Sequence, residues 1–390
     1  MTQDRSSPAR LTAAACLGIL IFGIVMALLG ALLPFLSQAL GVTLAQAGTL
    51  FFWMNLSMLS AAFLLGRLMD RAGMKAPMAA GPCLVAGALA LLAAADSATW
   101  LVAAACLLGI GGGMLNGATN TLVADLHTDP IRKGAALNRL GIFFGFGAVL
   151  LPFAIGALVE IAGWRVLLAA AAVLALVAGA SSVTLAFPPA KQREKPPPGQ
   201  VRKLIGERFV LVLGLLLFCQ SGCEFALGGF LSSFFILAKQ VPPVAASWLL
   251  ALYWMAVMAG RAAISRYLGK VGPTPLVVGC AVLAAISLLA LRQMAGTPGL
   301  ALGATALGLG VSGIYPTVLG IAGAAHPRQS GTVFGILFTF GLAGGMTLPW
   351  VVGRVGSAAG IGVALLIPAA AFAVIALLAA FSSRMRPAAA

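Results

Sequence analysis

The sequence predicts an all-α integral membrane protein with about twelve transmembrane helices arranged as two six-helix bundles. Three observations predict this class: the composition, the succession of long apolar segments, and a repeat shared by the two halves. Apolar residues make up 61% of the 390 residues and charged residues 8%, against about 45–50% and about 25% in ordinary soluble domains. A soluble domain could not bury so much apolar surface, so lipid is expected to be the solvent for most of the chain.

Each apolar segment is long enough to cross a bilayer as a helix, which needs about 20 residues. In chain order the predicted spans are 11–36, 44–66, 77–95, 99–122, 135–160, 164–187, 208–238, 245–268, 273–293, 298–321, 330–354 and 358–381. Arg5 and Arg10 precede the first span, as cations precede the apolar core of a signal peptide. That span is too long for such a core and no convincing cleavage site follows, so we interpret it as the first helix.

The repeat links residues 134–163 with residues 331–360. Five positions recur at one constant offset, namely Gly134/Gly331, Gly147/Gly344, Pro152/Pro349, Gly156/Gly353 and Gly163/Gly360. Upstream, residues 108–111 echo residues 307–310, and His127 echoes His326. We therefore expect one bundle in residues 1–187, a Pro-rich cationic linker in residues 188–206 and a second bundle in residues 207–390. Repeated bundles around a shared site near the membrane midplane are the design of secondary transporters.

The net charge of +15 is distributed unevenly over the predicted loops. Alternate loops hold nearly all the cations: Arg5, Arg10, Arg67, Arg71, Lys75, Arg132, Lys133, Lys191, Arg193, Lys195, Arg202, Lys203, Arg208, Arg261, Arg266, Lys270, Arg328, Arg384 and Arg386. Cation-rich loops stay cytoplasmic, so both termini are expected inside, in a cytoplasmic (inner) membrane. The opposite ends of the spans carry Trp100, Trp164, Trp248 and Trp350, as an aromatic belt would. No basic face with aromatic or groove-reading elements is present, so nucleic acid is not an expected partner.

Residues 66–75 (GRLMDRAGMK) follow the pattern G-x-L-x-D-R-x-G-x-K between the second and third predicted spans. On this motif, the twelve spans and the half-length repeat, the chain resembles the major facilitator superfamily over its whole length. Gly260-Arg261, followed by Arg266 and Lys270, returns the loop motif in the second half. The resemblance implies two six-helix bundles, each of inverted three-helix repeats, that alternate around a central cavity.

A finer resemblance, to the fucose-permease and sodium-glucose-transporter branch, rests on three segments. They are residues 115–120 (LNGATN), residues 136–145 with Ala136-Leu137-Asn138 and Phe143-Phe144-Gly145, and residues 222–230 with the pattern G-x-E-x-x-x-G-G-aromatic. This resemblance implies a sugar or related polyol as solute. One departure is that the first span carries no acid, whereas fucose permease has carboxylates in helices one and four.

Glu224 is the one carboxylate near the middle of a predicted span. An isolated charge there is costly, and a partner, a water-filled cavity or protonation relieves that cost. Gln220, Glu224 and Gly228 recur every four residues and line one helical face. We expect Glu224 to bind solute or the coupling ion, H⁺ or Na⁺; the alternative is a structural carboxylate hydrogen-bonded between helices.

Further candidate wall residues are amides and aromatics within spans. Asn116 and Asn120 form a polar stripe on the fourth span, with Asn138 at similar depth on the fifth. Amides bind sugar hydroxyls but also hold helices together. The remaining candidates, Asn55, Trp254 and Tyr315, could equally serve packing.

A second functional group follows from the resemblance alone. The loop residues Asp70 and Arg71, with Asp125 closing the fourth span, would form a charge cluster that latches the outward-open state. The alternative is a set of ordinary interfacial ion pairs, which contribute little when exposed.

The leading hypothesis is a secondary active transporter for a small polar solute, acting as a monomer in the bilayer. Export of amphiphilic drugs or lipids is the nearest rival, and a transporter-like sensor without flux is a third. No nucleotide-binding loop is present, so ATP is not expected as the energy source. We expect no enzymatic activity, since no paired acid or Ser/His arrangement lies at depth. Cys219 and Cys223 share a helical face, but no span holds a histidine, so we expect packing rather than a metal or other cofactor.

Overall fold

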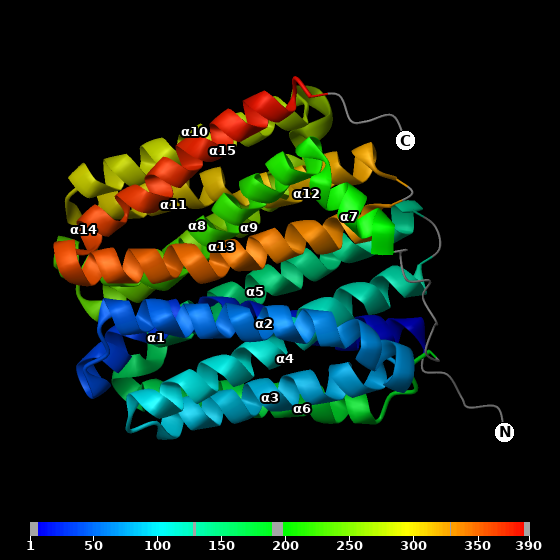
Figure 1. Cartoon of the computed structure of the whole chain (residues 1–390). Helices are drawn as coiled ribbons and strands as arrows, with labels where there is room; N and C mark the ends of the chain where they lie inside the picture. The colour runs from blue at the N-terminus through cyan, green and yellow to red at the C-terminus, as the bar shows by residue number, and fades with distance from the viewer. Residues whose placement is uncertain (1–6, 128–129, 189–197, 328, 386–390) are drawn as a thin grey trace. The chain divides into compact units, whose positions relative to one another are not determined.

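The chain folds into helices whose order follows the predicted spans (Figure 1). A computed structural model describes residues 7–127, 130–188, 198–327 and 329–385. Among these residues there is no strand, and 12 helices or helix pairs are long and apolar enough to cross a membrane. The predicted fold class, an all-α membrane protein with twelve spans, is confirmed.

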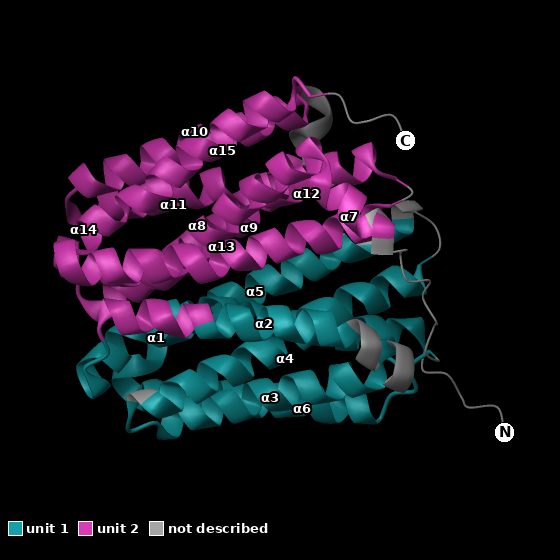
Figure 2. Cartoon of the chain, viewed as in Figure 1, with its two compact units in different colours: residues 1–42, 53–193 teal, residues 43–52, 194–390 magenta. Residues whose placement is uncertain are grey.

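Contacts divide the chain into two compact units, residues 1–42 with 53–193 and residues 43–52 with 194–390 (Figure 2). The first six helices are α1 (Pro8–Leu40), α2 (Leu44–Ala72), α3 (Lys75–Ala94), α4 (Ala98–Leu126), α5 (Pro130–Ala162) and α6 (Trp164–Val183). The first turns of α2 belong to the second unit, where the Ala45 N–H donates to Ser357 Oγ at 2.9 Å. This bond satisfies one of the amides that a helix start leaves without an intrahelical partner.

The remaining helices belong to the second unit. They are α7 (Pro198–Gly206), α8 (Arg208–Lys239), α9 (Pro243–Val271), α10 (Pro273–Gln293), α11 (Gly296–Ser312), α12 (Ile314–Ala325), α13 (Ser330–Ala359), α14 (Ile361–Ala364) and α15 (Leu366–Ser382). Of the predicted linker, residues 198–206 form α7, and residues 189–197 lie outside the described part of the chain.

Two predicted spans are interrupted. The tenth consists of α11 and α12, which meet at Gly313, and the twelfth consists of α14 and α15, which meet at Leu365. In each case a proline, Pro316 or Pro368, follows the break by three residues. A proline lacks the N–H for the i→i−4 bond, and its ring clashes with the carbonyl four residues earlier, so the helix breaks there.

The two units pair their helices alike. α1 packs on α5, and α3 on α4 and α6, in the first unit; α8 packs on α13, and α10 on α11 and α15, in the second. The repeated glycines lie at equivalent crossings. A Cβ at Gly147 would collide with the Leu20 carbonyl oxygen of α1, and one at Gly344 would collide with the Phe218 carbonyl oxygen of α8. The repeat therefore preserves glycine where two helix backbones touch.

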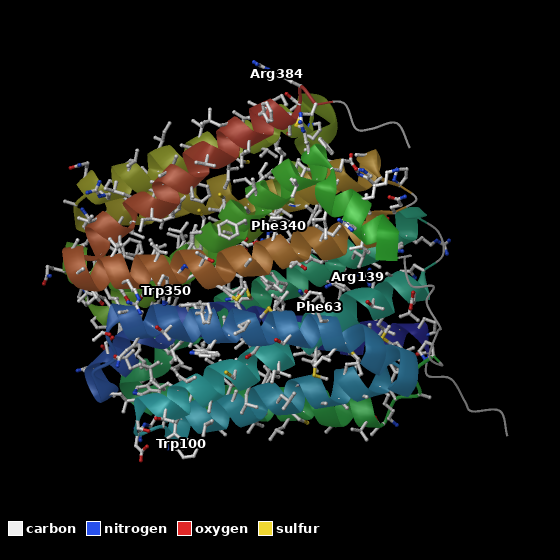
Figure 3. The ribbon with its side chains drawn as sticks, viewed as in Figure 1. Phe63, Trp100, Arg139, Phe340, Trp350 and Arg384 are labelled. Atoms are coloured by element: carbon white, nitrogen blue, oxygen red, sulfur yellow. The ribbon has the colours of Figure 1, made fainter. Side chains whose placement is uncertain are left out.

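Large apolar side chains remain exposed on both units, with Ile161 at 85% and Leu377 at 71%. Water would oppose such surfaces, whereas lipid tails solvate them. Figure 3 shows Trp100 and Arg139 toward opposite ends of the first unit, and Trp350 and Arg384 toward opposite ends of the second. The Arg354 guanidinium lies 4.6 Å from the Trp350 ring centroid, as a cation at an aromatic belt would.

Candidate functional site

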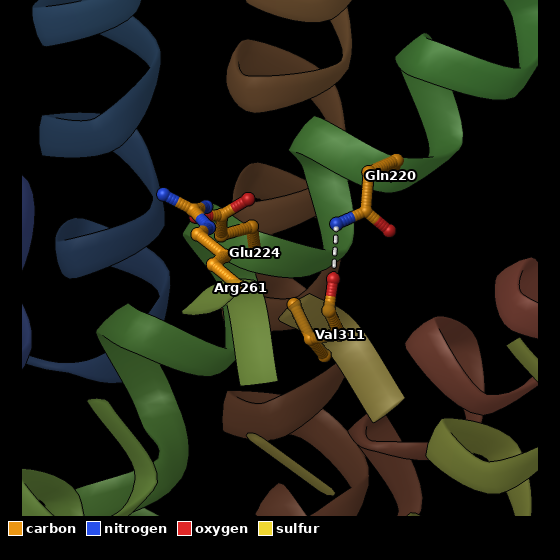
Figure 4. Close-up of polar contacts among 4 residues, drawn as sticks. All are labelled: Gln220, Glu224, Arg261 and Val311. Carbon is orange, nitrogen blue, oxygen red and sulfur yellow. Dashed lines mark hydrogen bonds and ion pairs between the residues drawn. The ribbon is translucent and has the colours of Figure 1, made fainter. Parts of the chain in front are cut away.

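Glu224 and Arg261 form an ion pair between α8 and α9 (Figure 4). Arg261 Nη2 donates to Glu224 Oε1 at 3.0 Å. Glu224 lies at the middle of α8, and Arg261 lies inside the apolar span Pro243–Ile264 of α9. A guanidinium beside a carboxylate is the partner that a charge inside an apolar helix requires.

The placement of Arg261 corrects the sequence analysis, which assigned it to a cytoplasmic loop by analogy with Arg67. α9 continues to Val271, ten residues beyond Arg261. The Cα atom of Arg261 therefore lies about 15 Å along the helix axis from the end of α9. The sequence held a signal for this placement, because residue 261 falls within the predicted span 245–268 and Glu224 is a lone carboxylate in another span. The analogy with the loop motif favoured the wrong assignment.

The face of α8 that carries Glu224 contacts a neighbouring helix at each of the positions 220, 224 and 228. The contact is with α11 at position 220 and with α9 at positions 224 and 228. Gln220 Nε2 donates to the Val311 carbonyl oxygen of α11 at 3.3 Å (Figure 4). A Cβ at Gly228 would lie 2.9 Å from Cζ2 of Trp254, so glycine lets the indole pack flat on the helix. The predicted residues Gln220, Glu224 and Trp254 therefore lie along one interface of α8 with α9 and α11, called the cluster below.

Two tyrosines complete this cluster. Tyr253 is fully buried and packs edge-on against Trp254, with 5.3 Å between ring centroids. Tyr315, at the start of α12 just after the break at Gly313, stacks on Phe338 at 6.4 Å. Sequence reasoning selected Tyr315 but missed Tyr253, which nothing distinguishes from a packing aromatic in the sequence.

Several polar atoms of the cluster have hydrogen-bonding capacity to spare. Among the residues that the structure describes, Gln220 Oε1, Tyr253 Oη and Trp254 Nε1 are buried without a hydrogen-bond partner. Buried polar groups are nearly always paired, so each of these atoms calls for a water or a ligand. The cluster thus offers one carboxylate, one guanidinium, two donors and one amide acceptor.

The predicted residues of the first unit form a separate group. Asn120 Nδ2 donates to the Asn116 carbonyl oxygen at 2.8 Å and to Asn116 Oδ1 at 3.1 Å, so these amides bond along α4. Asn55 of α2 is fully buried. The side chain of Asn138 on α5 lies outside the described part of the structure.

Of the charge cluster implied by the resemblance, only one side chain is described. Asp125 is half-buried, one residue before the end of α4. Asp70 and Arg71 lie on the last turn of α2, and their side chains are outside the described residues. The latch therefore stays a prediction.

His326 makes a contact that the sequence did not indicate. Its Nε2 lies 2.9 Å from Glu207 Oε2, and its ring lies tilted against that of Phe209 with 6.4 Å between centroids, so the end of α12 contacts the start of α8. Cys223 Sγ lies 3.6 Å from the Pro368 carbonyl oxygen, a contact within the helix packing. Within the described residues, no group of three or more His, Cys, Asp or Glu side chains could hold a metal ion.

Comparisons with known proteins agree on family and fold. The sequence model of the Major Facilitator Superfamily matches residues 15–240, more than half of the chain. A curated relative from Danio rerio, named probable vesicular acetylcholine transporter-B, is 29% identical over 177 residues, which cover 45% of this chain and 36% of the relative. The chain thus matches little more than a third of that relative's length.

Two solved structures share the fold. One is the nucleoside transporter NupG, with a TM-score of 0.81, 15% identity, and coverage of 95% of this chain and 99% of the other. The second is a bacterial homologue of the human lysosomal transporter Spinster, inward-facing and unoccupied, with a TM-score of 0.80, 14% identity, and coverage of 97% and 98%. At these identities the likeness establishes the fold alone.

Proposed function

The chain belongs to the major facilitator superfamily of secondary transporters, and we propose that it moves a small polar solute, a sugar or polyol, coupled to an ion through Glu224. The observation that carries this proposal is the Glu224–Arg261 pair inside two apolar helices. A buried pair that serves stability alone is readily replaced by apolar residues. A titratable carboxylate inside a span is by default a functional-site hypothesis.

The coupling step follows from the charge of Glu224. While ionised, the carboxylate holds Arg261 Nη2 at 3.0 Å. A proton or Na⁺ bound to Glu224 weakens that attraction and lets α9 carry the guanidinium away from α8. Two arrangements of one pair, each favoured by a different ligand, are what alternating access requires.

A polyhydroxylated solute is supported by the spare polar atoms. Within the described cluster, the Trp254 Nε1 donor and the Gln220 Oε1 acceptor are buried without partners, and sugar hydroxyls both donate and accept. We assign Tyr315 a place in the wall. We also propose the amides of Asn55, Asn116, Asn120 and Asn138 as solute-binding groups, and Asp70, Arg71 and Asp125 as the latch of one state.

We also propose that the protein lies in a cytoplasmic (inner) membrane. Both termini and the linker 188–206 would face the cytoplasm, because cation-rich loops stay on that side. Labelling of a single cysteine placed in that linker tests the orientation, because reactivity only from outside would contradict it.

A second candidate is export of a cationic amphiphile. The rings of Tyr253 and Trp254 pack on each other in the cluster that also holds the carboxylate of Glu224, and such a combination attracts organic cations. The partial relative named an acetylcholine transporter supports this class of solute. A sensor without flux is the third alternative, which any measured transport would exclude.

The deciding experiment compares wild type with Glu224→Gln in proteoliposomes under an imposed proton or sodium gradient. We expect the variant to lose gradient-driven accumulation of the solute but to retain exchange, because Gln keeps the size and hydrogen bonding of Glu without its titration. Glu160→Gln, which alters an exposed carboxylate at the end of α5, is the matched control and should transport normally. Undiminished accumulation by Glu224→Gln would place coupling elsewhere.

A further inference from the structure

We propose that the solute carries a carboxylate, so that it is a sugar acid or a related hydroxy acid, and that this carboxylate binds Arg261 in exchange for Glu224. This inference rests on the proposed function and names the solute class of the same cluster.

The two charges are unequally exposed. The Arg261 side chain is 28% exposed, whereas that of Glu224 is 8% exposed. The guanidinium is therefore the more accessible of the two charges. The planar guanidinium fork matches a carboxylate with two parallel hydrogen bonds, which a neutral hydroxyl cannot provide.

Coupling changes the charge balance of the pair. From residue 198 to the C-terminus the sequence holds only two acidic side chains, Glu207 and Glu224. Glu207 contacts His326 and lies 17 residues before Glu224, which separates their Cα atoms by about 25 Å along α8. Among the acidic residues of this part of the chain, Glu224 is therefore the one paired with Arg261, and a proton on it removes the carboxylate charge of the pair. A carboxylate on the solute restores that balance, whereas a neutral sugar does not.

The surrounding atoms are rich in hydrogen-bond donors. Trp254 Nε1 is a donor only, and Tyr253 Oη can donate as well. Both atoms are buried without a partner within the described residues. Trp254 and Arg261 lie seven residues apart, on one face of α9. Donors along this face favour a solute rich in acceptor oxygens, and Gln220 Oε1 can accept from one of its hydroxyls.

The charges also set the stoichiometry. One proton on Glu224 and one carboxylate on Arg261 leave the charge of the cluster unchanged. A phosphate ester, with nearly two negative charges at neutral pH, would overcompensate the single guanidinium. The class is therefore a monocarboxylate, and a sugar phosphate serves as the contrasting probe.

The test measures thermal stabilisation of the purified full-length protein by matched neutral and acidic probes: glucose and glucuronate, galactose and galacturonate, glycerol and glycerate, with glucosamine and glucose 6-phosphate as cationic and dianionic contrasts. Ligand binding to the folded state raises the midpoint by mass action. We expect at least one acid to stabilise the protein more than its neutral parent. Equal or smaller stabilisation by every acid, or stabilisation by glucose 6-phosphate or glucosamine alone, would overturn the proposal.

Variants assign the effect to Arg261. Glu224→Gln removes the competing carboxylate and should tighten binding of the acid by about tenfold or more. Arg261→Gln should abolish the preference for the acid, and Arg354→Gln, which alters the exposed guanidinium beside Trp350, should keep it. If Arg261→Gln proves unstable, the double variant Glu224→Gln/Arg261→Gln removes both charges and should bind acid and parent equally. An acid preference that survives in the double variant would sink the proposal.

Failure of this inference can be told apart from failure of the proposed function. A neutral sugar accumulated through Glu224 would refute the carboxylate and leave the coupling proposal intact. An acid bound through Arg261 but accumulated normally by Glu224→Gln would refute the coupling and leave the carboxylate class intact.

Discussion

Placing the Glu224 carboxylate and the Arg261 guanidinium between apolar helices costs desolvation free energy, which their attraction at 3.0 Å offsets. Neither charge is tolerated well without the other, because the one that remains keeps its desolvation cost without compensation. A pair of this kind is stable in either of two conditions: both charged and in contact, or both neutralised by ligands. That property suits a transporter, which must pass between loaded and unloaded states.

This balance predicts a pattern of stabilities. Arg261→Gln leaves Glu224 without its guanidinium and should lower the free energy of unfolding by about 2–4 kcal/mol, toward the lower value because Arg261 is partly exposed. The double variant Glu224→Gln/Arg261→Gln should recover most of that loss, since it buries no charge. Thermal midpoints in detergent provide the measurement, with Arg354→Gln as the control. A double variant no more stable than Arg261→Gln would contradict the account.

Single residues differed in how well the sequence revealed them. Glu224 was predictable because a lone acid stands out in an apolar segment. Its partner Arg261 lies in the predicted span 245–268, a signal that the loop analogy hid. The contact between the two could not be predicted in any case, because it depends on the rotation of α8 and α9 about their axes, and weak periodicity in nearly all-apolar helices leaves that rotation undefined. The spare hydrogen-bonding capacity of Tyr253 and Trp254 likewise exists only in three dimensions.

Between helices, the close crossings of α1 with α5 and of α8 with α13 depend on glycine. The carbonyl oxygens of Leu20 and Phe218 occupy the space that a side chain at Gly147 or Gly344 would need. Backbone atoms cannot rotate away as a flexible side chain can. A methyl group at either position must therefore push two helices apart.

We expect Gly147→Ala and Gly344→Ala each to destabilise the protein by about 1–3 kcal/mol, the usual cost of overpacking. Gly141→Ala and Gly335→Ala are matched controls on the same helices, α5 and α13, because a Cβ at either meets nothing within 4 Å. The controls should be neutral or stabilising by up to about 1 kcal/mol, as alanine favours helix over glycine. Equal effects of test and control substitutions on the thermal midpoint would show that helix propensity, not contact, explains the repeat.

Element boundaries were predictable wherever hydropathy changes sharply, as at the start of α8 or the end of α10. The two interruptions were not predicted, although Pro316 and Pro368 mark them in the sequence. Proline alone does not decide the outcome: Pro34 and Pro152 lie inside continuous helices. Whether a proline breaks a membrane helix depends on whether neighbouring groups satisfy the freed carbonyl, which the sequence does not state.

For the whole molecule, the repeat visible at Gly147/Gly344 corresponds to two units with the same helix pairing. The carboxylate of the ion pair, however, is not duplicated, because the first predicted span, residues 11–36, holds no acid. The ion pair lies in the second unit, whereas the position of Arg261 echoes Arg67, a residue of the loop motif in the first half. The helix pairing is thus common to both halves, whereas the Glu224–Arg261 pair, to which we assign ion coupling, belongs to the second half.

The most direct measurement of this claim is ion movement driven by the solute. Proteoliposomes that hold a pH- or sodium-sensitive dye report ion entry when the solute is added outside without any imposed gradient. The account predicts solute-driven ion entry for wild type and for the Glu160→Gln control. For Glu224→Gln it predicts no ion entry, although isotope exchange of the same solute continues. Ion entry by Glu224→Gln at the wild-type ratio of ion to solute would contradict it.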